Sequence, residues 1–234
     1  MPIKRPPLVN NEIYHLVIRG VGDERIFKDI NDYYRGIFSL FEFNNRNPVE
    51  ISDRRRKRKL QKSKGEQFSD TRDRLVDILQ FCFMPNHIHL LVRQIADMGI
   101  TNFMRKLGAG YAAYFNKKYQ RKGHLFQGRF YAVHIKNEEQ LQTVFVYIHA
   151  NPVSLIEPNW KENGIQDSRK AIRFLKDYKW SSHQDYIGHN NFPSVTERSL
   201  LLGIFGGNEG CGSYMNDWIE YKRKLNHWDV VGIE

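Results

Sequence analysis

The alternation of apolar and polar positions predicts four strands and three helices in the first 150 residues. Apolar residues at helical spacing predict helices at 29–43, 100–119 and about 137–150. Short β-prone runs predict strands at 13–18, 75–83, 87–92 and 130–135. This order of elements is typical of a ferredoxin-like α+β sandwich, in which helices pack on a central antiparallel sheet.

Two parts of the chain fall outside this pattern. Residues 44–71 hold no sustained apolar period, which predicts a poorly ordered insertion or long connection within a domain spanning 1–158. The remainder, 159–234, is expected to form a helical C-terminal extension. Its glycine-rich stretch Gly203–Gly212 lacks the ending of a phosphate-binding loop and is interpreted as a connection between two helices.

Positive charge changes the picture, because the net charge is +10 and much of it is concentrated in that insertion. Without eight of its basic residues the net charge would be 10 − 8 = +2. Such a run fits a phosphate backbone, and it equally fits a solvated loop. The eight residues are Arg54, Arg55, Arg56, Lys57, Arg58, Lys59, Lys62 and Lys64.

Two cysteines, Cys82 and Cys211, lie far apart and lack the spacing of a zinc or redox site. No leader-like segment begins the sequence, and no apolar run is long enough to cross a membrane. We therefore expect a cytoplasmic protein with no membrane contact.

The first candidate for chemistry is the triplet His87-Ile88-His89. Side chains alternate along a strand, so both imidazoles project from one face and can bind one metal ion. Alone, this spacing is also compatible with two incidental strand histidines.

The second candidate is the end of the last predicted helix. Tyr147 and Asn151 are four residues apart and share one flank, while His149 points away and is expected on the surface or against a partner. Pro152 is expected to move Asn151 out of helical geometry, leaving its amide oxygen to face a ligand. The alternative is that Asn151 only ends the helix and Tyr147 only packs on the core.

A third segment, Gly123 to Phe130, combines cationic and aromatic side chains, as a groove for single-stranded DNA does. A loop that merely packs an aromatic pair is the alternative. Basic residues just upstream favour DNA contact. The residues assigned to DNA here are Lys117, Lys118, Arg121, Lys122, His124 and Arg129, beside Arg54 to Arg58 of the basic run.

Three blocks together resemble the signature of the REP-associated tyrosine transposases, in the HUH single-tyrosine transposase superfamily. The resemblance extends from Tyr14-His15 and Arg19-Gly20 to Trp180-Ser181-Ser182 and the stretch 201–206, and so covers most of the chain. The basic insertion departs from the family's short form. The blocks are Met84-Pro85-Asn86-His87-Ile88-His89-Leu90-Leu91-Val92, Gly123-His124-Leu125-Phe126-Gln127-Gly128-Arg129-Phe130 and Tyr147-Ile148-His149-Ala150-Asn151-Pro152-Val153.

This resemblance implies a ferredoxin-like HUH nuclease. His87 and His89 would hold a divalent cation on the scissile phosphate of single-stranded DNA, Tyr147 would attack it, and Asn151 would be a third ligand. Two imidazoles and an amide carry no charge, which favours Mg²⁺ or Mn²⁺ completed by phosphate and water, with zinc as a further option. The implied protein nicks and joins hairpin-containing or REP-like DNA through a 5′-phosphotyrosine link, as a monomer or homodimer, and its extension contacts DNA.

Two other functional classes are alternatives to this interpretation. A non-catalytic DNA-binding protein derived from a transposase would use the basic insertion alone, but the complete set of His87, His89, Tyr147 and Asn151 argues against it. A two-histidine phosphoesterase would need two H-x-Thr or H-x-Ser motifs, and the sequence has no such motif.

Overall fold

The computed structural model describes residues 5–65 and 69–224. Four strands form one antiparallel sheet in the order β2-β3-β1-β4. They are β1 (Ile13–Arg19), β2 (Val76–Met84), β3 (His87–Gln94) and β4 (Tyr131–Ile135). With the helices between them, this order is that of a ferredoxin-like α+β sandwich, which confirms the predicted fold class.

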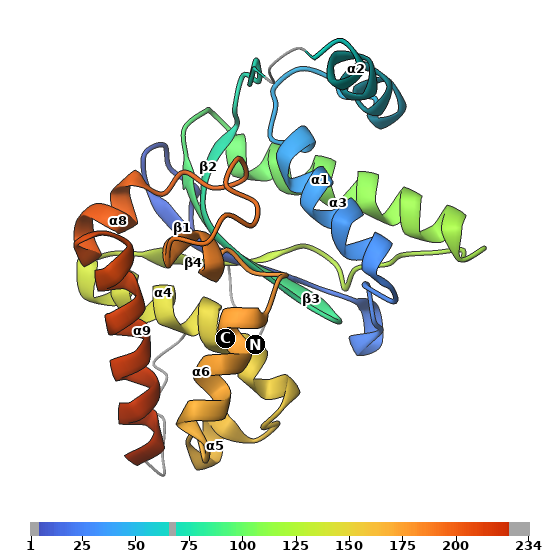
Figure 1. Ribbon diagram of the computed structural model, residues 1–234. Helices are drawn as coiled ribbons and strands as arrows, with labels where there is room; N and C mark the ends of the chain where they lie inside the picture. Colours follow the sequence, from blue (N-terminus) through green and yellow to red (C-terminus); the bar gives the residue numbers. More distant parts are fainter. Residues whose placement is uncertain (1–4, 66–68, 225–234) are drawn as a thin grey trace.

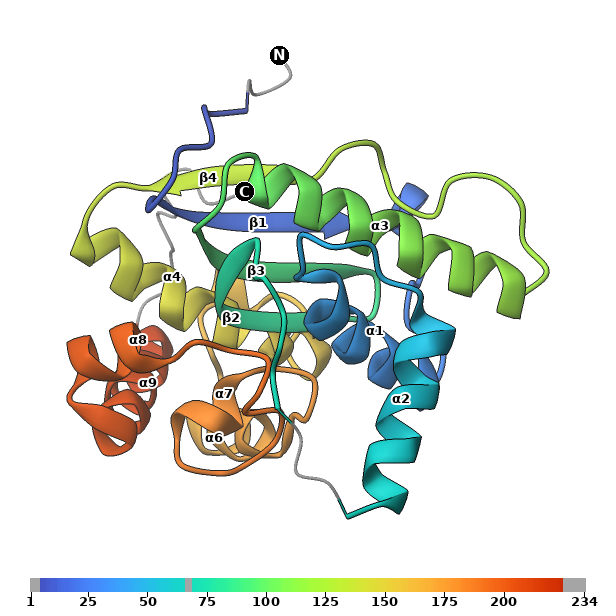
Figure 2. The same ribbon diagram turned by 90° about the horizontal axis from the view of Figure 1, so that it is seen from above.

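Helices cover both faces of the sheet, with α1 (Ile30–Phe43) and α3 (Gly99–Lys118) on one face. The other face holds α4 (Glu138–Ala150) and the helical extension, as Figures 1 and 2 show. The extension comprises α5 (Trp160–Asn163), α6 (Ser168–Asp177), α7 (His183–Tyr186), α8 (Ser199–Phe205) and α9 (Gly207–Lys224), after the 3₁₀ helix η2 (Asn151–Leu155). A further 3₁₀ helix, η1, spans Val21–Asp23.

Local chemistry explains where the main helices begin. The Asp29 side chain accepts hydrogen bonds from the backbone of Asn31 and Asp32, and Asp32 accepts one from the backbone of Asp29, so α1 starts with a capping box. The Asn137 side chain caps α4 through the backbone of Gln140.

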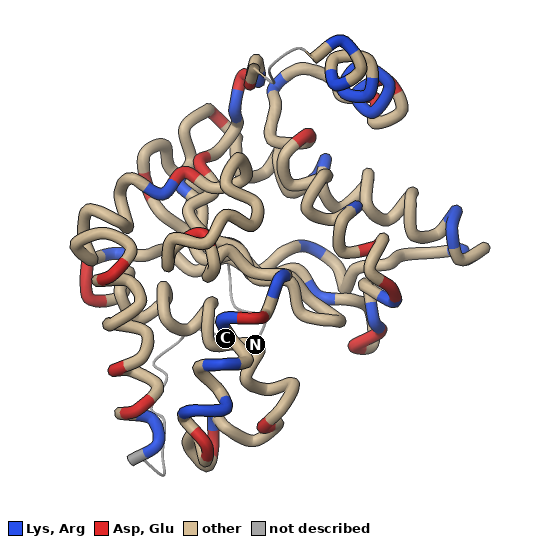
Figure 3. The backbone as a smooth tube through the Cα atoms, in the orientation of Figure 1, with Lys and Arg blue, Asp and Glu red and all other residues tan. Residues whose placement is uncertain are grey.

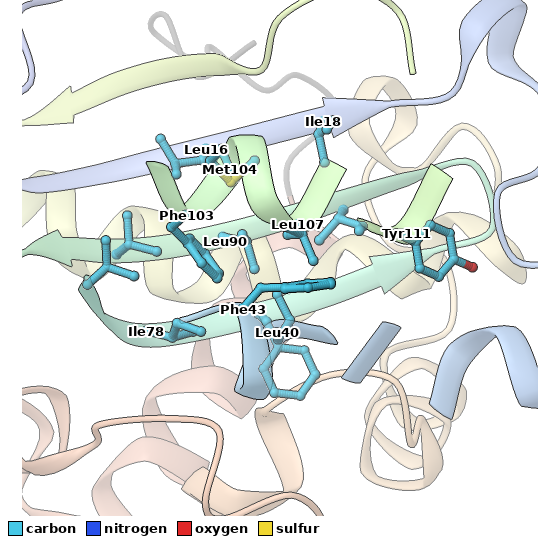
Figure 4. Packing of buried hydrophobic residues seen from close by; sticks show 14 of the residues in the cluster. Leu16, Ile18, Leu40, Phe43, Ile78, Leu90, Phe103, Met104, Leu107 and Tyr111 are labelled. Atoms are coloured by element: carbon cyan, nitrogen blue, oxygen red, sulfur yellow. The ribbon is translucent and has the colours of Figure 1, made fainter. Parts of the chain in front are cut away.

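The core under α1 and α3 is mainly apolar. Leu16 and Ile18 of β1 and Leu90 of β3 pack against Phe103 and Leu107 of α3, as Figure 4 shows. These residues alternate along β1 and β3 with His15, His87 and His89. The three imidazoles therefore lie on the opposite face of the sheet.

Two expectations about the outer segments are wrong. The basic run is helical, because Ile51–Ser63 forms α2 although no residue of that helix is buried. The glycine-rich stretch is mostly helix as well: only Gly206, with a φ of 74°, separates α8 from α9. Tertiary packing of α8 and α9 on the rest of the extension outweighs the low helix propensity of glycine there.

The extension continues the sheet layer rather than standing apart from it. The backbone of Phe83 donates to the carbonyl of Trp180, and that of Ser182 donates to the carbonyl of Phe81, along the outer edge of β2. Apolar residues of α4 and of α6 to α9 share one core. Among the described helices none is long and apolar enough to span a bilayer.

Candidate active site

His87 and His89 lie side by side on β3, on the sheet face that α4 covers. Their ring centroids are 4.8 Å apart, and the two side chains lie opposite Arg19 and Val17 of β1. His87 is 9% exposed and His89 is 3% exposed. The alternation of side chains along the strand thus places both imidazoles as the sequence predicted.

Hydrogen bonding defines which nitrogen of each imidazole can bind a metal. Nδ1 of His87 lies 2.7 Å from the amide oxygen of Asn86, which can only accept, so Nδ1 carries the proton and Nε2 carries the lone pair. Nε2 of His89 is buried and has no hydrogen-bond partner among the described residues. Such an orphaned nitrogen fits a metal ligand.

Electrostatics keeps His89 in the state that a metal requires. Burial is the main cause that holds the pKa of His89 well below its ordinary value, and the closeness of the His87 imidazole disfavours a charge on His89 as well. The imidazole is therefore neutral at neutral pH and offers a lone pair.

His15 of β1 is part of this cluster, although the sequence analysis did not assign it a role. Its Nε2 lies 2.9 Å from Nδ1 of His89, and the side chain is fully buried. It sits diagonally across the strand pair from His89. The sequence showed only that His15 lies in a predicted strand. Its contact with His89 depends on how β1 and β3 pair, which the sequence did not show.

Tyr147 of α4 completes the cluster. Its ring lies 5.7 Å from that of His89 and 5.8 Å from that of His15, in edge-on contacts. The Lys161 ammonium, from α5, donates a hydrogen bond of 3.0 Å to the Tyr147 hydroxyl. Tyr147 is 1% exposed, so its side chain is closed off from solvent.

Asn151 follows Tyr147 by one helical turn, but the expected departure from helical geometry is wrong. Its φ and ψ are −48° and −40°, and η2 begins at this residue. Pro152 is tolerated because it lies in the first turn of the new helix, where no backbone donor is needed. The Asn151 amide nitrogen donates to the Tyr147 carbonyl at 3.1 Å, so the amide oxygen is the atom that could bind a cation.

No group of three or more His, Cys, Asp or Glu side chains suited to a metal occurs among the described residues. A metal site here would consist of the two imidazoles, with Asn151 as the candidate third ligand. The lone-pair nitrogen of His87 and the orphaned nitrogen of His89 fit a divalent cation, whose remaining positions would be left to phosphate and water.

The expected surface position of His149 is wrong. The side chain is fully buried, with Nε2 3.0 Å from the Ser182 hydroxyl and the rings of Phe145 and Tyr186 against it. The extension covers this flank of α4, which helical periodicity alone could not reveal.

The basic helix α2 has two differently used faces. Arg54 and Arg58 point to α1, where both contact buried Glu42, at 3.5 and 2.8 Å. Arg55, Arg56 and Lys57 are exposed, with Lys59 and Lys62 continuing the exposed face. Figure 3 shows the resulting concentration of positive charge along α2.

The basic residues in the last turn of α3 and just after it are divided in the same way. Lys118 contacts Asp29 and Asp32 at 2.7 and 2.6 Å, and Arg121 contacts Glu24 at 2.6 Å. Lys117 and Lys122 are exposed. Two of these four residues, Lys118 and Arg121, therefore form ion pairs within the protein.

The segment from Gly123 to Phe130 borders a cavity of about 610 Å³ against α3. His124 and Arg129 line it together with Arg5, Arg105 and Phe126, and no acidic side chain lines it among the residues that the structure describes. The Arg5 guanidinium stacks on the Phe130 ring at 3.8 Å. Neither Arg5 nor Arg105 was assigned from the sequence, because only the fold brings them to this segment.

Comparisons with solved structures give likenesses of low identity. A REP-associated tyrosine transposase bound to a REP hairpin is 14% identical, with 85% of this chain and 96% of that chain covered and a TM-score of 0.46. A candidate transposase from Deinococcus radiodurans is also 14% identical, with 60% and 92% covered and a TM-score of 0.33. The tRNA(His) guanylyltransferase of Saccharomyces cerevisiae is 12% identical, with 75% and 76% covered and a TM-score of 0.31.

These likenesses are too distant to carry a functional argument, and no curated protein matches the chain. The family comparison is specific: residues 41–151 match the family described as Transposase IS200 like. That segment contains His87, His89, Tyr147 and Asn151. The match relates this segment of the chain, residues 41–151, to the IS200-like transposases.

Proposed function

We propose that this protein is an HUH-type transposase that cuts and joins single-stranded DNA through a covalent bond to Tyr147. The observation that carries the proposal is the position of the Tyr147 ring 5.7 Å from that of His89, which in turn lies beside His87. A nucleophilic hydroxyl and a pair of metal-binding nitrogens thus meet on one sheet face.

The chain's own residues supply binding, orientation and the nucleophile. A divalent cation, Mg²⁺ or Mn²⁺, would be held by His87, His89 and Asn151 and would neutralise charge on the scissile phosphate. Tyr147 would attack phosphorus in line and release the 3′ oxygen, so that a 5′-phosphotyrosine and a 3′-hydroxyl result. The phosphotyrosine is itself a phosphodiester, so it retains the energy of the bond that was broken. A second 3′-hydroxyl would therefore reverse the step without a nucleotide cofactor.

Positive surfaces would hold the DNA strand. The exposed residues of α2 suit contact with the phosphate backbone irrespective of sequence. The cavity beside His124 and Arg129 suits a strand with unstacked bases, because it combines guanidinium groups with aromatic rings. We propose hairpin-containing or REP-like single-stranded DNA as the substrate, and the cytoplasm, where the thiols of Cys82 and Cys211 stay free, as the site of the reaction.

A denaturing-gel assay tests the proposal. Labelled single-stranded hairpins from the flanks of the protein's own gene are incubated with protein and Mn²⁺, and a covalent adduct is expected. Tyr147→Phe should abolish the adduct but retain DNA binding. If the wild-type protein binds these hairpins and forms no adduct, the non-catalytic DNA-binding alternative is correct.

A further inference from the structure

We propose that Lys161 is a catalytic residue that binds the attacking oxygen of Tyr147 and stabilises its negative charge during attack. The proposal rests on the proposed function, and it extends the active site into the C-terminal extension. Lys161 Nζ donates to the Tyr147 hydroxyl at 3.0 Å and lies 5.0 Å from the centre of the Tyr147 ring.

Packing of the extension fixes where Lys161 lies. The preceding residue, Trp160, is 1% exposed and belongs to the core shared by α4 and α9. Its ring meets that of Trp218 of α9 edge-on, with centroids 5.9 Å apart. Lys161 therefore lies in the first turn of α5, directly after a residue whose side chain is held in the core.

The surroundings of Tyr147 indicate what the Lys161 ammonium does during attack. The rings of His15 and His89 contact the Tyr147 phenol edge-on, and the phenolic oxygen becomes negative as Tyr147 attacks. The ammonium of Lys161 is a charged group bound to that oxygen. A charge-assisted hydrogen bond to an anion is about twice as strong as a neutral one, so this interaction strengthens as charge develops.

The step balances without a further reactant. The Tyr147 oxygen forms a bond to phosphorus, and the bond from phosphorus to the 3′ oxygen breaks. Water takes the phenolic proton, and the departing 3′ oxygen gains a proton from water. Lys161 remains protonated throughout, because it stabilises the oxygen and does not take its proton. The same hydrogen bond assists rejoining, in which the phenolate is the leaving group.

The test compares Lys161→Met, which keeps the length of the side chain and removes the charge, with Lys161→Arg, which keeps the charge. Lys170→Met is the matched control, because Lys170 is exposed on neighbouring α6. Adduct formation is measured in single turnover with saturating hairpin and Mn²⁺. We expect a loss of about 100-fold for Lys161→Met, the effect of removing one stabilising donor, partial recovery with Lys161→Arg, and no change in the control.

Four further measurements separate catalysis from structure. Hairpin affinity, Mn²⁺ affinity and the thermal midpoint should be unchanged in Lys161→Met. With a substrate whose 3′ bridging oxygen is replaced by sulfur, the difference between wild type and Lys161→Met should persist, because Lys161 acts on the nucleophile. Its disappearance would assign Lys161 to the leaving group instead.

The outcomes are distinguishable from failure of the proposed function. Absence of an adduct in the wild-type protein overturns both assignments. An adduct that forms equally fast in wild type and Lys161→Met overturns the role of Lys161 alone. A defect confined to DNA or Mn²⁺ affinity also overturns it, and makes Lys161 a binding residue.

Discussion

Nε2 of His15 lies 2.9 Å from Nδ1 of His89, so the two strand histidines form one hydrogen-bonded pair. If Nε2 of His89 binds a metal, its Nδ1 carries the proton and donates it to His15. A partner of this kind holds the ligand imidazole in the correct tautomer and orientation. His15 would then be a positioning residue for the metal site.

The first prediction follows from this pair. Replacement of His15 by Phe removes the acceptor and should weaken Mn²⁺ binding by about ten- to a hundred-fold. His15→Gln offers an amide oxygen to the same proton and should retain most of the affinity. Free Mn²⁺ is counted by electron paramagnetic resonance without DNA, and His87→Ala serves as the reference for loss of a ligand. Equal affinities in the Phe and Gln variants would show that His15 only fills space.

The second prediction concerns the exposed face of α2. Replacement of Lys57, Lys59 and Lys62 by Gln should weaken binding of single-stranded DNA similarly for every sequence. The slope of log affinity against log salt should flatten by about 0.7 for each phosphate that these lysines no longer neutralise. Fluorescence anisotropy at several salt concentrations measures both effects. A loss restricted to one sequence would make α2 a reader of bases.

The opposite face of α2 provides the control. Arg54→Gln with Arg58→Gln removes both ion pairs to buried Glu42, so α2 should detach from α1. Faster backbone hydrogen exchange in α2 should report this detachment. Unchanged exchange would mean that these ion pairs do not hold the helix.

The third prediction concerns the cavity beside α3. A Cβ at Gly108 would meet only Ile18 and Phe126, at 3.7 and 4.0 Å, so a larger side chain can enter the cavity without displacing backbone. Gly108→Leu should lower affinity for single-stranded DNA by about tenfold, the value of one stacked base. Gly203→Leu is the matched helical control, since a Cβ there meets nothing within 4 Å. Equal affinity in the two variants would exclude the cavity as a DNA site.

The fourth prediction concerns the fold's response to acid. Although burial acts to raise it, hydrogen bonds from Lys118 and Tyr119 hold the pKa of Asp32 below its ordinary value. This contribution is therefore present above the unfolded-state pKa and is lost as pH falls through the lower folded-state pKa. Asp32→Asn should reduce the free energy of unfolding by about 2 kcal/mol at neutral pH, and by less near pH 3.

Urea unfolding of both proteins across this pH range measures the effect. Asp29→Asn is a useful comparison, because it keeps a capping oxygen at the start of α1 while removing the charge that faces Lys118. A constant difference between wild type and Asp32→Asn at every pH would show that the charge of Asp32 is not what stabilises α1.

The sequence allowed prediction of the elements whose pattern is local. The alternation in β3 placed His87 and His89 on one face, and the apolar spacing of α3 and α4 set the helices that cover the sheet. Strand order then followed from a known arrangement of strands and helices. The helix over Ile51–Ser63 was missed because its charged surface leaves no apolar period to detect.

The parts of the site that the sequence did not predict depend on interactions between distant segments. His15 meets His89 across 74 positions of sequence, and Lys161 reaches Tyr147 from a segment predicted to lie beyond the domain. His149 was misplaced for the same reason, because the residues that bury it belong to the extension. Periodicity reports which face of an element is apolar but not which later segment covers it.

The closed centre around Tyr147 has a consequence for the fate of the covalent intermediate. DNA must displace the segments that cover Tyr147 before attack. If these segments close again over the phosphotyrosine, as they cover the 1%-exposed side chain in the structure, they shield it from attack by water. Such shielding would lengthen the lifetime of the intermediate and leave a DNA 3′-hydroxyl, delivered along the bound strand, as the favoured acceptor. Strand exchange would then prevail over hydrolysis because the fold controls which nucleophile can reach phosphorus.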